Sequence, residues 1–296
     1  MSNQSINEFD IVFISFDEPN ADENYADLVE KCPWAKRSHG VFGSDAAHKA
    51  AADMAETQRF ITIDADNIVD PTFFNVEVDM TKIRGMDVIS WAGKNEINGL
   101  VYGNGGIKCW PKDVVYNMKT HENAPADDKR AQVDFCWNIH YVQMNNIYCQ
   151  VMNNASPLQA WRAGFREGVK MSLNRGAPVK NLKEIWWQNY HRLLIWMNVG
   201  ADIKNGMYCL LGAREGCYKT MCTNWDHTQT RDFEYLNSLW KENNYGEHNV
   251  VDAVENIGTL VRNELSIPVS VYPLDNQQSE FFKTVYLNSD RVIRKK

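Results

Sequence analysis

The sequence predicts an α/β protein whose sheet presents a ligand site at the carboxyl ends of its strands. Three observations lead to this prediction. Short β-rich runs alternate with helical segments between residues 10 and 64. Two acidic residues, Asp64 and Asp66, directly follow the third run, and the pattern becomes helical after about residue 156. Such alternation is typical of βαβ units, and α/β sheets bind their ligands at the carboxyl ends of the strands.

The first elements are each predicted from local sequence. The run DIVFISF is rich in β-forming residues and ends in a turn-forming stretch, which is typical of a buried strand. The stretch DAAHKAAADMAE is rich in alanine, which favours a helix. The predicted strands cover residues 10–16, 36–42 and 60–63, and the predicted helices run from Asn20 or Asp22 to about Lys31 and over 45–56.

Later elements follow from the same signals. A Gly-rich stretch at 98–106 indicates a loop or hairpin between two short apolar runs. The expected strands are 87–91 and 107–110, and the expected helices are 161–173, 182–198, 233–240 and 250–265. A boundary near residues 155–160 would give domains 1–155 and 156–296, although a single domain with a helical second half fits the pattern equally well.

Composition and charge exclude several classes of protein. Hydrophobic residues make up 44% of the chain and charged residues 23%, which is typical of a folded globular protein. No apolar run reaches the ~18 residues of a membrane helix, and the N-terminus lacks the features of a signal peptide. Seven cysteines without a framework spacing favour reduced thiols, so we expect a cytoplasmic protein without a membrane partner.

The charges are unevenly spread although the net charge is −7. The first thirty residues hold eight acidic residues and no Lys or Arg, whereas residues 162–183 hold six basic residues and one acidic residue. Arg162, Arg166 and Lys170 are spaced for one helix face, which suits contact with a phosphate-bearing acceptor, while a merely solvated face is the alternative. The C-terminal tail adds Arg291, Arg294, Lys295 and Lys296.

The pair Asp64 and Asp66 is the strongest chemical signal. Two carboxylates two residues apart at a strand end can share one divalent cation, and oxygen ligands suit Mn²⁺ or Mg²⁺. Such a cation would neutralise a diphosphate held beside it. A haloacid-dehalogenase-like phosphatase also has this motif, but at an earlier place in the chain, and a solvated acidic turn remains the structural alternative.

Several longer segments together resemble a known family. They are SFDEPNADENYADL, KRSHGVFGSDAAHKAAADMAETQRFITIDADN, NGLVYGNGGIKCWPK, LQAWRAGFREGVKM and VGADIKNGMYCLLGAREG. This ordered set is similar to family-2-like glycosyltransferases of the GT-A fold encoded by tailed phages. The resemblance implies a GT-A-like mixed sheet with a helical C-terminal half. It also implies a nucleotide-sugar donor, such as a UDP-sugar or UDP-arabinose, and 5-hydroxymethylcytosine in double-stranded phage DNA as acceptor, inside the infected host cell.

The resemblance also assigns roles to residues. Asp17, Glu18 and Pro19 would contact the nucleoside, Asp64 would lie near the ribose and the metal, and Asp66 would bind the metal. A late ligand, His227, would complete the metal site. The general base would be Asp134, for which the alternative is a helix cap, or else Asp202. The remaining candidates are His39, Gly105 and Gly106 on the donor side, and Tyr102, Trp110 and Arg214 on the acceptor side.

Two other readings of the whole chain stay open. The first keeps the glycosyltransferase but replaces DNA with an envelope polysaccharide or another glycan as acceptor. The second is a protein of another class, a non-catalytic phage protein that binds DNA or carbohydrate. Convergence of Asp64, Asp66 and a bound metal on one site would separate an enzyme from such a binding protein.

Overall fold

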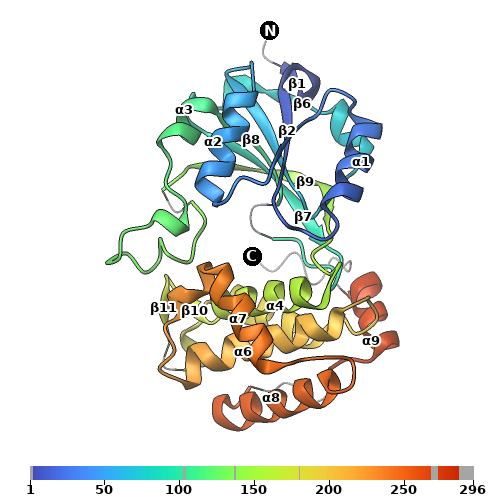
Figure 1. Cartoon of the computed structure of the whole chain (residues 1–296), viewed down its shortest axis with the longest axis vertical. Helices are drawn as coiled ribbons and strands as arrows, with labels where there is room; N and C mark the ends of the chain where they lie inside the picture. Colours follow the sequence, from blue (N-terminus) through green and yellow to red (C-terminus); the bar gives the residue numbers. More distant parts are fainter. Residues whose placement is uncertain (1–2, 103–104, 137, 180, 268–272, 287–296) are drawn as a thin grey trace. The chain divides into compact units, whose positions relative to one another are not determined.

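The computed structural model describes residues 3–102, 105–136, 138–179, 181–267 and 273–286 of the chain. It divides into two compact units (Figure 1). The sheet unit consists of Met1–Asn95, Val101–Ala124 and Phe135–Met152, and the helical unit consists of Glu96–Leu100, Pro125–Asp134 and Asn153–Lys296. The main change of unit therefore falls between residues 152 and 153, and two short segments from the first half join the helical unit, which the sequence did not indicate.

The sheet unit is built on a curled, mixed sheet of seven strands, which confirms the predicted α/β class. In order across the sheet, the strands are β3 (Lys36–His39), β2 (Asp10–Ser15), β4 (Arg59–Asp64), β8 (Ile107–Pro111), β7 (Val88–Asn95), β9 (Tyr141–Val151) and β5 (Asn67–Val69). The strands β2, β3 and β4 are parallel, whereas β8 runs antiparallel to both β4 and β7. A separate small sheet pairs β1 (Asn3–Ser5) with β6 (Glu77–Asp79).

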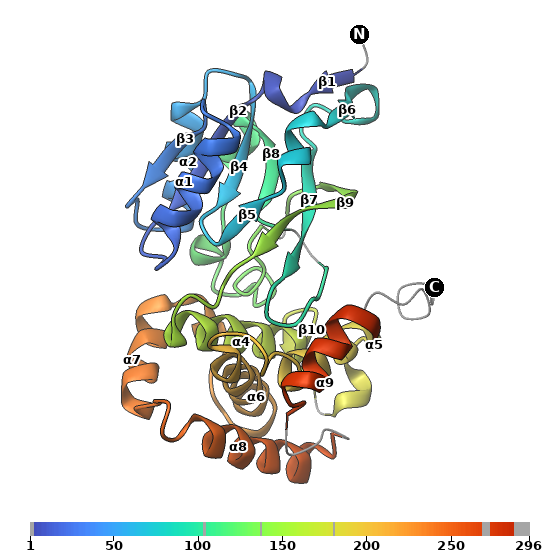
Figure 2. The ribbon, with the colours of Figure 1, turned by 90° about the vertical axis from the view of Figure 1, so that its right-hand side faces the viewer.

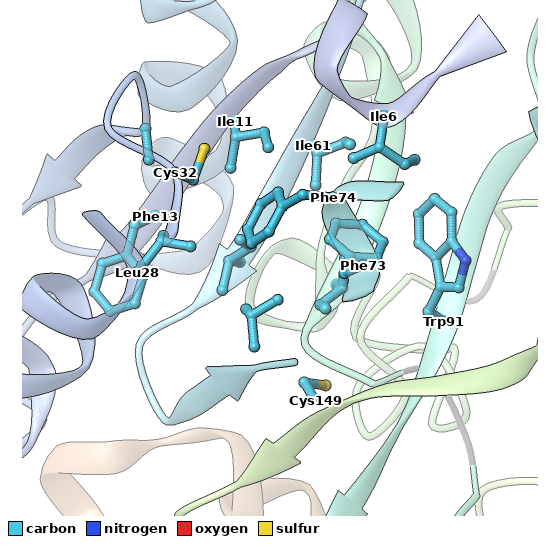
Figure 3. Packing of buried hydrophobic residues seen from close by; sticks show 14 of the residues in the cluster. Ile6, Ile11, Phe13, Leu28, Cys32, Ile61, Phe73, Phe74, Trp91 and Cys149 are labelled. Carbon is cyan, nitrogen blue, oxygen red and sulfur yellow. The ribbon is translucent and has the colours of Figure 1, made fainter. Parts of the chain in front are cut away.

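Helices cover both faces of this sheet. The helix α1 (Ala21–Lys31) lies on one face, and α2 (Ser44–Met54) and α3 (Lys112–Asn117) lie on the other (Figure 1). Successive residues of a strand point to opposite faces. Phe13 of β2 therefore packs in the core on the α1 side, shown in Figure 3, while Val12 packs in the core on the α2 side.

The order of the strands creates a switch point in the sheet. From β2 the chain passes through α1 to β3 on one side, and then through α2 to β4 on the other side of β2. The loops that leave β2 and β4 therefore diverge, and α/β sheets bind ligands in the crevice that such divergence opens at the carboxyl ends. The loop after β2 begins at Phe16, and the loop after β4 contains Asp66.

The helical unit is organised around α6 (Gly206–Cys222), which is buried along most of its length. The other described helices of this unit are α4 (Pro157–Met171), α5 (Trp187–Asn198), α7 (Phe233–Asn243), α8 (Val250–Leu265) and α9 (Asn276–Phe281), and a small hairpin joins β10 (Leu173–Asn174) to β11 (Ala177–Pro178). Figures 1 and 2 show α6 between α4 and α8. Among the described helices, none is long and apolar enough to pass through a lipid bilayer.

Glycines let α4 and α6 approach closely. An added Cβ at Gly164 of α4 would lie 1.9 Å from the carbonyl oxygen of Cys209 on α6. The relation is reciprocal, since a Cβ at Gly212 of α6 would lie 2.1 Å from the carbonyl oxygen of Trp161 on α4. The two backbones are therefore in direct contact, and no larger residue fits at either position without displacing a helix.

We expect Gly164→Ala to lower the free energy of unfolding by about 3 kcal/mol or more, because overpacking of this kind forces backbone shifts. Chemical denaturation of the purified protein measures this change. Gly85→Ala is the matched control, because a Cβ at Gly85 has no neighbour within 4 Å. An equal effect of the two substitutions would contradict the close packing of α4 on α6.

Candidate functional site

The segment that carries Asp64 and Asp66 is held in place by hydrogen bonds from neighbouring parts of the sheet unit. Asp64 is the last residue of β4, and its amide donates to the carbonyl oxygen of Gly106 at 3.0 Å. The amide of Met152 donates to the carbonyl oxygen of Asp66 at 2.6 Å, and the side-chain amide of Asn24 donates to the carbonyl oxygen of the intervening Ala65 at 2.7 Å. The backbone between the two carboxylates is therefore fixed on three sides.

A buried lysine accompanies the first carboxylate. Lys108 belongs to β8, beside β4 in the sheet, and only 6% of its surface is exposed. Its Nζ donates to the carbonyl oxygen of Gly105 at 2.7 Å and lies 4.0 Å from Oδ2 of Asp64. Because the ion pair is long and one side of Asp64 stays exposed, this carboxylate keeps oxygen lone pairs available for a ligand.

The second carboxylate lies in a less favourable electrostatic setting. Burial, together with the negative charges of Asp64 and Glu18, raises the pKa of Asp66 from its ordinary 3.8 to about 7. Oδ1 of Asp66 accepts a hydrogen bond of 2.7 Å from the side-chain amide of Asn67. Oδ1 of Asn67 is itself buried and has no hydrogen-bond partner among the described residues. Such a group of oxygens would be stabilised by a proton or by a cation.

This pKa shift gives a prediction for stability. Between about pH 4 and pH 7 the folded protein keeps a proton on Asp66 that the unfolded chain has lost, so the free energy of unfolding falls as the pH rises. Asp66→Asn cannot titrate at this position, so the variant is free of this decrease in the free energy of unfolding. In EDTA, we expect the Tm of the variant to exceed that of the wild type by about 2–4 °C or more at pH 8, and by much less near pH 4.5. A Tm difference that is the same at both pH values would contradict the shift.

Gly105 and Gly106 have a structural reason to lack side chains. A Cβ on Gly105 would lie 2.4 Å from the amide nitrogen of Gly93 and the carbonyl oxygen of Trp91, both on β7. A Cβ on Gly106 would lie 2.1 Å from Nδ2 of Asn67. The glycines thus allow the chain to pack against β7 and against Asn67, beside the carboxylate pair. Gly103 and Asn104 of the same stretch lie outside the described residues.

The predicted nucleoside-contacting loop lies at the same edge of the sheet. Asp17 and Pro19 are exposed, and the carboxylate of Glu18 folds back to accept from the amide of Phe16 at 2.7 Å. Glu18 is close enough for its charge to act on Asp66, which links the loops after β2 and β4.

His39 lies at the carboxyl end of β3, on the same edge. Its Nδ1 is 2.9 Å from the hydroxyl of Ser15 on β2 and 3.3 Å from Nη2 of Arg37. Arg37 in turn forms an ion pair of 2.8 Å with Asp22. His39 is exposed and within reach of a ligand bound at this edge.

The third proposed metal ligand has a structural partner in the helical unit. His227 is buried, and its Nε2 lies 2.9 Å from the carbonyl oxygen of Gly176 in the same unit. Burial lowers its pKa, which favours the neutral ring. Within the described part of the chain, no three His, Cys, Asp or Glu side chains form a ready-made metal site. Two carboxylates with an amide oxygen remain as the candidate protein ligands.

The two candidate bases differ in their surroundings, and both belong to the helical unit. Asp134 is exposed and lines a pocket with Arg130 and Lys170. Among the described residues no helix begins directly after Asp134, so the alternative of a helix cap is wrong. Its amide instead closes a turn on the carbonyl oxygen of Arg130 at 3.1 Å. Asp202 is paired with Lys283 at 2.5 Å, and both side chains are largely buried.

Two predicted acceptor residues are core residues instead. Trp110 is completely buried on β8, and its Nε1 donates to the hydroxyl of Thr62 at 2.9 Å, so it offers no ring for stacking. Arg214 is also completely buried in α6. Its guanidinium donates to the carbonyl oxygens of Met197 and Val254 at 2.9 and 2.8 Å, which ties α6 to the end of α5 and to α8. Neither side chain is accessible to an acceptor in this structure.

The predicted basic face of α4 exists but is partly engaged. The guanidinium groups of Arg162 and Arg166 lie 4.5 and 4.8 Å from the ring centre of Phe233 on α7. Nζ of Lys170 lies 2.5 Å from Oε1 of Glu167. All three cations are half-buried, so their stems pack against the unit while their charges stay near the surface.

Tyr102 is half-buried and is the last described residue before the gap at 103–104 in the Gly-rich stretch. The basic tail with Arg291, Arg294, Lys295 and Lys296 lies outside the described residues. Two residues beside the carboxylates, Lys108 and Asn67, were missed in the sequence. A lone lysine within an apolar strand was the available signal for Lys108.

Comparison with protein-family models and with curated protein sequences finds no match for this chain.

Proposed function

We propose that this chain is a metal-dependent glycosyltransferase that uses a nucleotide-activated sugar. The observation that carries the proposal is the pair Asp64 and Asp66 at the switch point of the sheet, with the pKa of Asp66 raised to about 7. Two carboxylates that repel each other at neutral pH do not stabilise the fold. Such a pair is well suited to a cation, since strongly shifted pKa values concentrate at functional sites.

The donor atoms fit Mn²⁺ or Mg²⁺. The two carboxylates and the unpartnered Oδ1 of Asn67 are hard oxygen ligands, and sites of this kind are commonly completed by phosphate oxygens of a substrate. A cation bound here would stabilise the charge that develops on a departing nucleoside diphosphate. Lys108 adds a fixed positive charge beside Asp64, and the loop of Asp17, Glu18 and Pro19 lies where a nucleoside would meet the same edge.

For the chemical step, we assign the role of base to Asp134. Its exposed carboxylate would take the proton of the acceptor hydroxyl while that oxygen bonds to the anomeric carbon of the sugar. The bond between the anomeric carbon and the diphosphate breaks at the same time, and the nucleoside diphosphate leaves with the bonding electrons. Asp202 is less suited to the role, because Lys283 already neutralises it.

We further propose 5-hydroxymethylcytosine in phage DNA as the acceptor, with a glycan as the alternative. The basic face of α4 supports a phosphate-bearing acceptor. Trp110 and Arg214 do not support it, because both side chains are completely buried. The second candidate activity is a haloacid-dehalogenase-like phosphatase, because a carboxyl group with a pKa of about 7 also suits a proton donor.

The test incubates the protein with Mn²⁺, a panel of nucleotide-sugars, and hydroxymethylated DNA, plain DNA or glycans, followed by mass spectrometry of the acceptor. We expect the mass of one sugar residue to be added to hydroxymethylated DNA only. Sugar added to a glycan alone would replace the DNA acceptor. Phosphate release from p-nitrophenyl phosphate that depends on Asp64, without any transfer of sugar, would replace the glycosyltransferase by the phosphatase.

A further inference from the structure

A pocket of about 690 Å³ lies within the helical unit. Its walls come from the segment that contains Arg130 and Asp134, from the end of α4 with the β10–β11 hairpin, and from the start of α5. The pocket combines an exposed aromatic ring with several cations.

The hairpin brings one of these cations to the pocket in an unusual backbone conformation. Asn174 pairs with Ala177, so Arg175 and Gly176 form the turn, and both have positive φ, of 51° and 81°. Tight turns of this kind normally carry Asn, Asp or Gly at the first central position, and an arginine there costs roughly 1 kcal/mol or more. Strain that is retained in a native structure often marks a functional position.

The same turn brings a second cation alongside. A Cβ on Gly176 would lie 2.4 Å from the Cα atom of Arg130, so the hairpin tip packs directly on the backbone of that residue. Arg130 and Arg175 are both exposed, and both line the pocket with Lys170. Two acidic side chains, Asp134 and Glu184, also line it. The carboxylate of Glu184 accepts from the side-chain amide of Asn181 at 2.7 Å.

The aromatic side chain of the pocket is that of Trp186, the residue directly before α5. Its side chain is 59% exposed and lines the pocket. An exposed ring in the wall of a pocket is free to stack on a bound ligand. The next residue, Trp187, is similarly exposed at 55% but is not among the pocket-lining residues, which makes it a natural internal control.

We propose that this pocket binds one unstacked nucleotide of a nucleic-acid strand. The base stacks on Trp186, and the flanking phosphates meet Arg175 and Arg130. Aromatic stacking beside a cationic wall is the arrangement by which proteins bind single-stranded or flipped-out nucleotides. Asp134 also lines the pocket, so a hydroxyl group on the bound nucleobase would lie beside this carboxylate, the candidate general base. This last role rests on the proposed function, whereas the binding itself does not.

The first test measures binding of a fluorescein-labelled single-stranded oligonucleotide of about twelve nucleotides by fluorescence anisotropy, at about 50 mM salt. We expect Trp186→Ala to weaken binding by about 10-fold or more, since stacking on one aromatic ring contributes about 1–3 kcal/mol per base. Trp187→Ala should change the affinity less than about twofold. The proposal would be overturned if the two variants lost affinity for the oligonucleotide to the same extent, if both bound it as tightly as the wild type, or if the wild type did not bind it.

The second test removes a charge without disturbing the turn. Asparagine tolerates a positive φ, so Arg175→Asn keeps the hairpin and deletes one phosphate contact. The slope of log K against log salt should become shallower by about 0.7, whereas Lys241→Gln on the exposed face of α7 should leave the slope unchanged. An unaltered slope in Arg175→Asn would overturn the phosphate contact.

The two proposals can fail separately. Asp66→Asn should bind the oligonucleotide as the wild type does, so oligonucleotide binding that depends on Trp186 would stand even if no sugar transfer is found. Conversely, sugar transfer to a neutral oligosaccharide, with Trp186-dependent binding of that sugar and none of the oligonucleotide, would overturn the nucleotide pocket and leave the glycosyltransferase in place.

Discussion

Asp66→Asn is expected to lower the turnover number for sugar transfer by roughly a thousand-fold, which is the scale of losing one preorganised electrostatic contact to the departing group. The substitution removes the negative charge but keeps the shape of the side chain and an oxygen that can face Nδ2 of Asn67. The fold should therefore persist. Steady-state assays with a saturating nucleotide-sugar and Mn²⁺ measure the effect.

The control for this variant is Asp113→Asn, which makes the same substitution at an exposed position of the sheet unit. It should retain the activity of the wild type. Turnover by Asp66→Asn within about threefold of the wild type, or full activity of the wild type in EDTA, would contradict a metal held by this pair.

Asp134→Asn is expected to reduce kcat by at least ~10²-fold, because the acceptor hydroxyl then loses the group that takes its proton. Binding of the donor should change little, since removal of the proton from the acceptor hydroxyl belongs to the chemical step and not to donor binding. Separate measurement of kcat and of the Kd for the donor distinguishes this result from a general loss of structure.

Asp127→Asn provides the comparison for Asp134→Asn. Asp127 lies in the same segment and is exposed, but it does not line the pocket that contains Asp134. Its substitution should leave kcat unchanged. If kcat is also unchanged in Asp134→Asn, the assignment of the base is wrong, and a mechanism that retains the configuration of the sugar without a protein base becomes the better account.

Elements with strong local signals could be predicted from the sequence. The strand at 10–15, the Ala-rich α2 and the helix α8 are confirmed within a few residues. The strand predicted over 36–42 ends at His39, because Gly40 takes a positive φ of 73° and turns the chain. The long strand β9 was missed, since Gln and Asn residues interrupt its apolar residues and only one of its side chains is fully buried, and its place is determined by backbone pairing with β7.

The candidate site was predictable only in part, for a physical reason. The place of Asp64 and Asp66 follows from the alternation of strands and helices, because topology puts the end of a central strand at a switch point. Burial of single side chains depends on tertiary packing instead. Trp110 and Arg214 are residue types that often contact ligands, yet both are completely buried, whereas Trp186 is exposed.

Binding of nucleoside diphosphates in the presence and absence of Mn²⁺, measured by isothermal titration calorimetry, tests the central claim most directly. The panel contains UDP, GDP, ADP, CDP and TDP, each with the wild type and with Asp66→Asn. We expect at least one of them to bind the wild type with Mn²⁺, with the affinity falling at least ~10-fold in EDTA and in Asp66→Asn. Absence of binding for all five, or binding that is unaffected by EDTA and by the substitution, would contradict a metal-dependent site for a nucleotide-sugar.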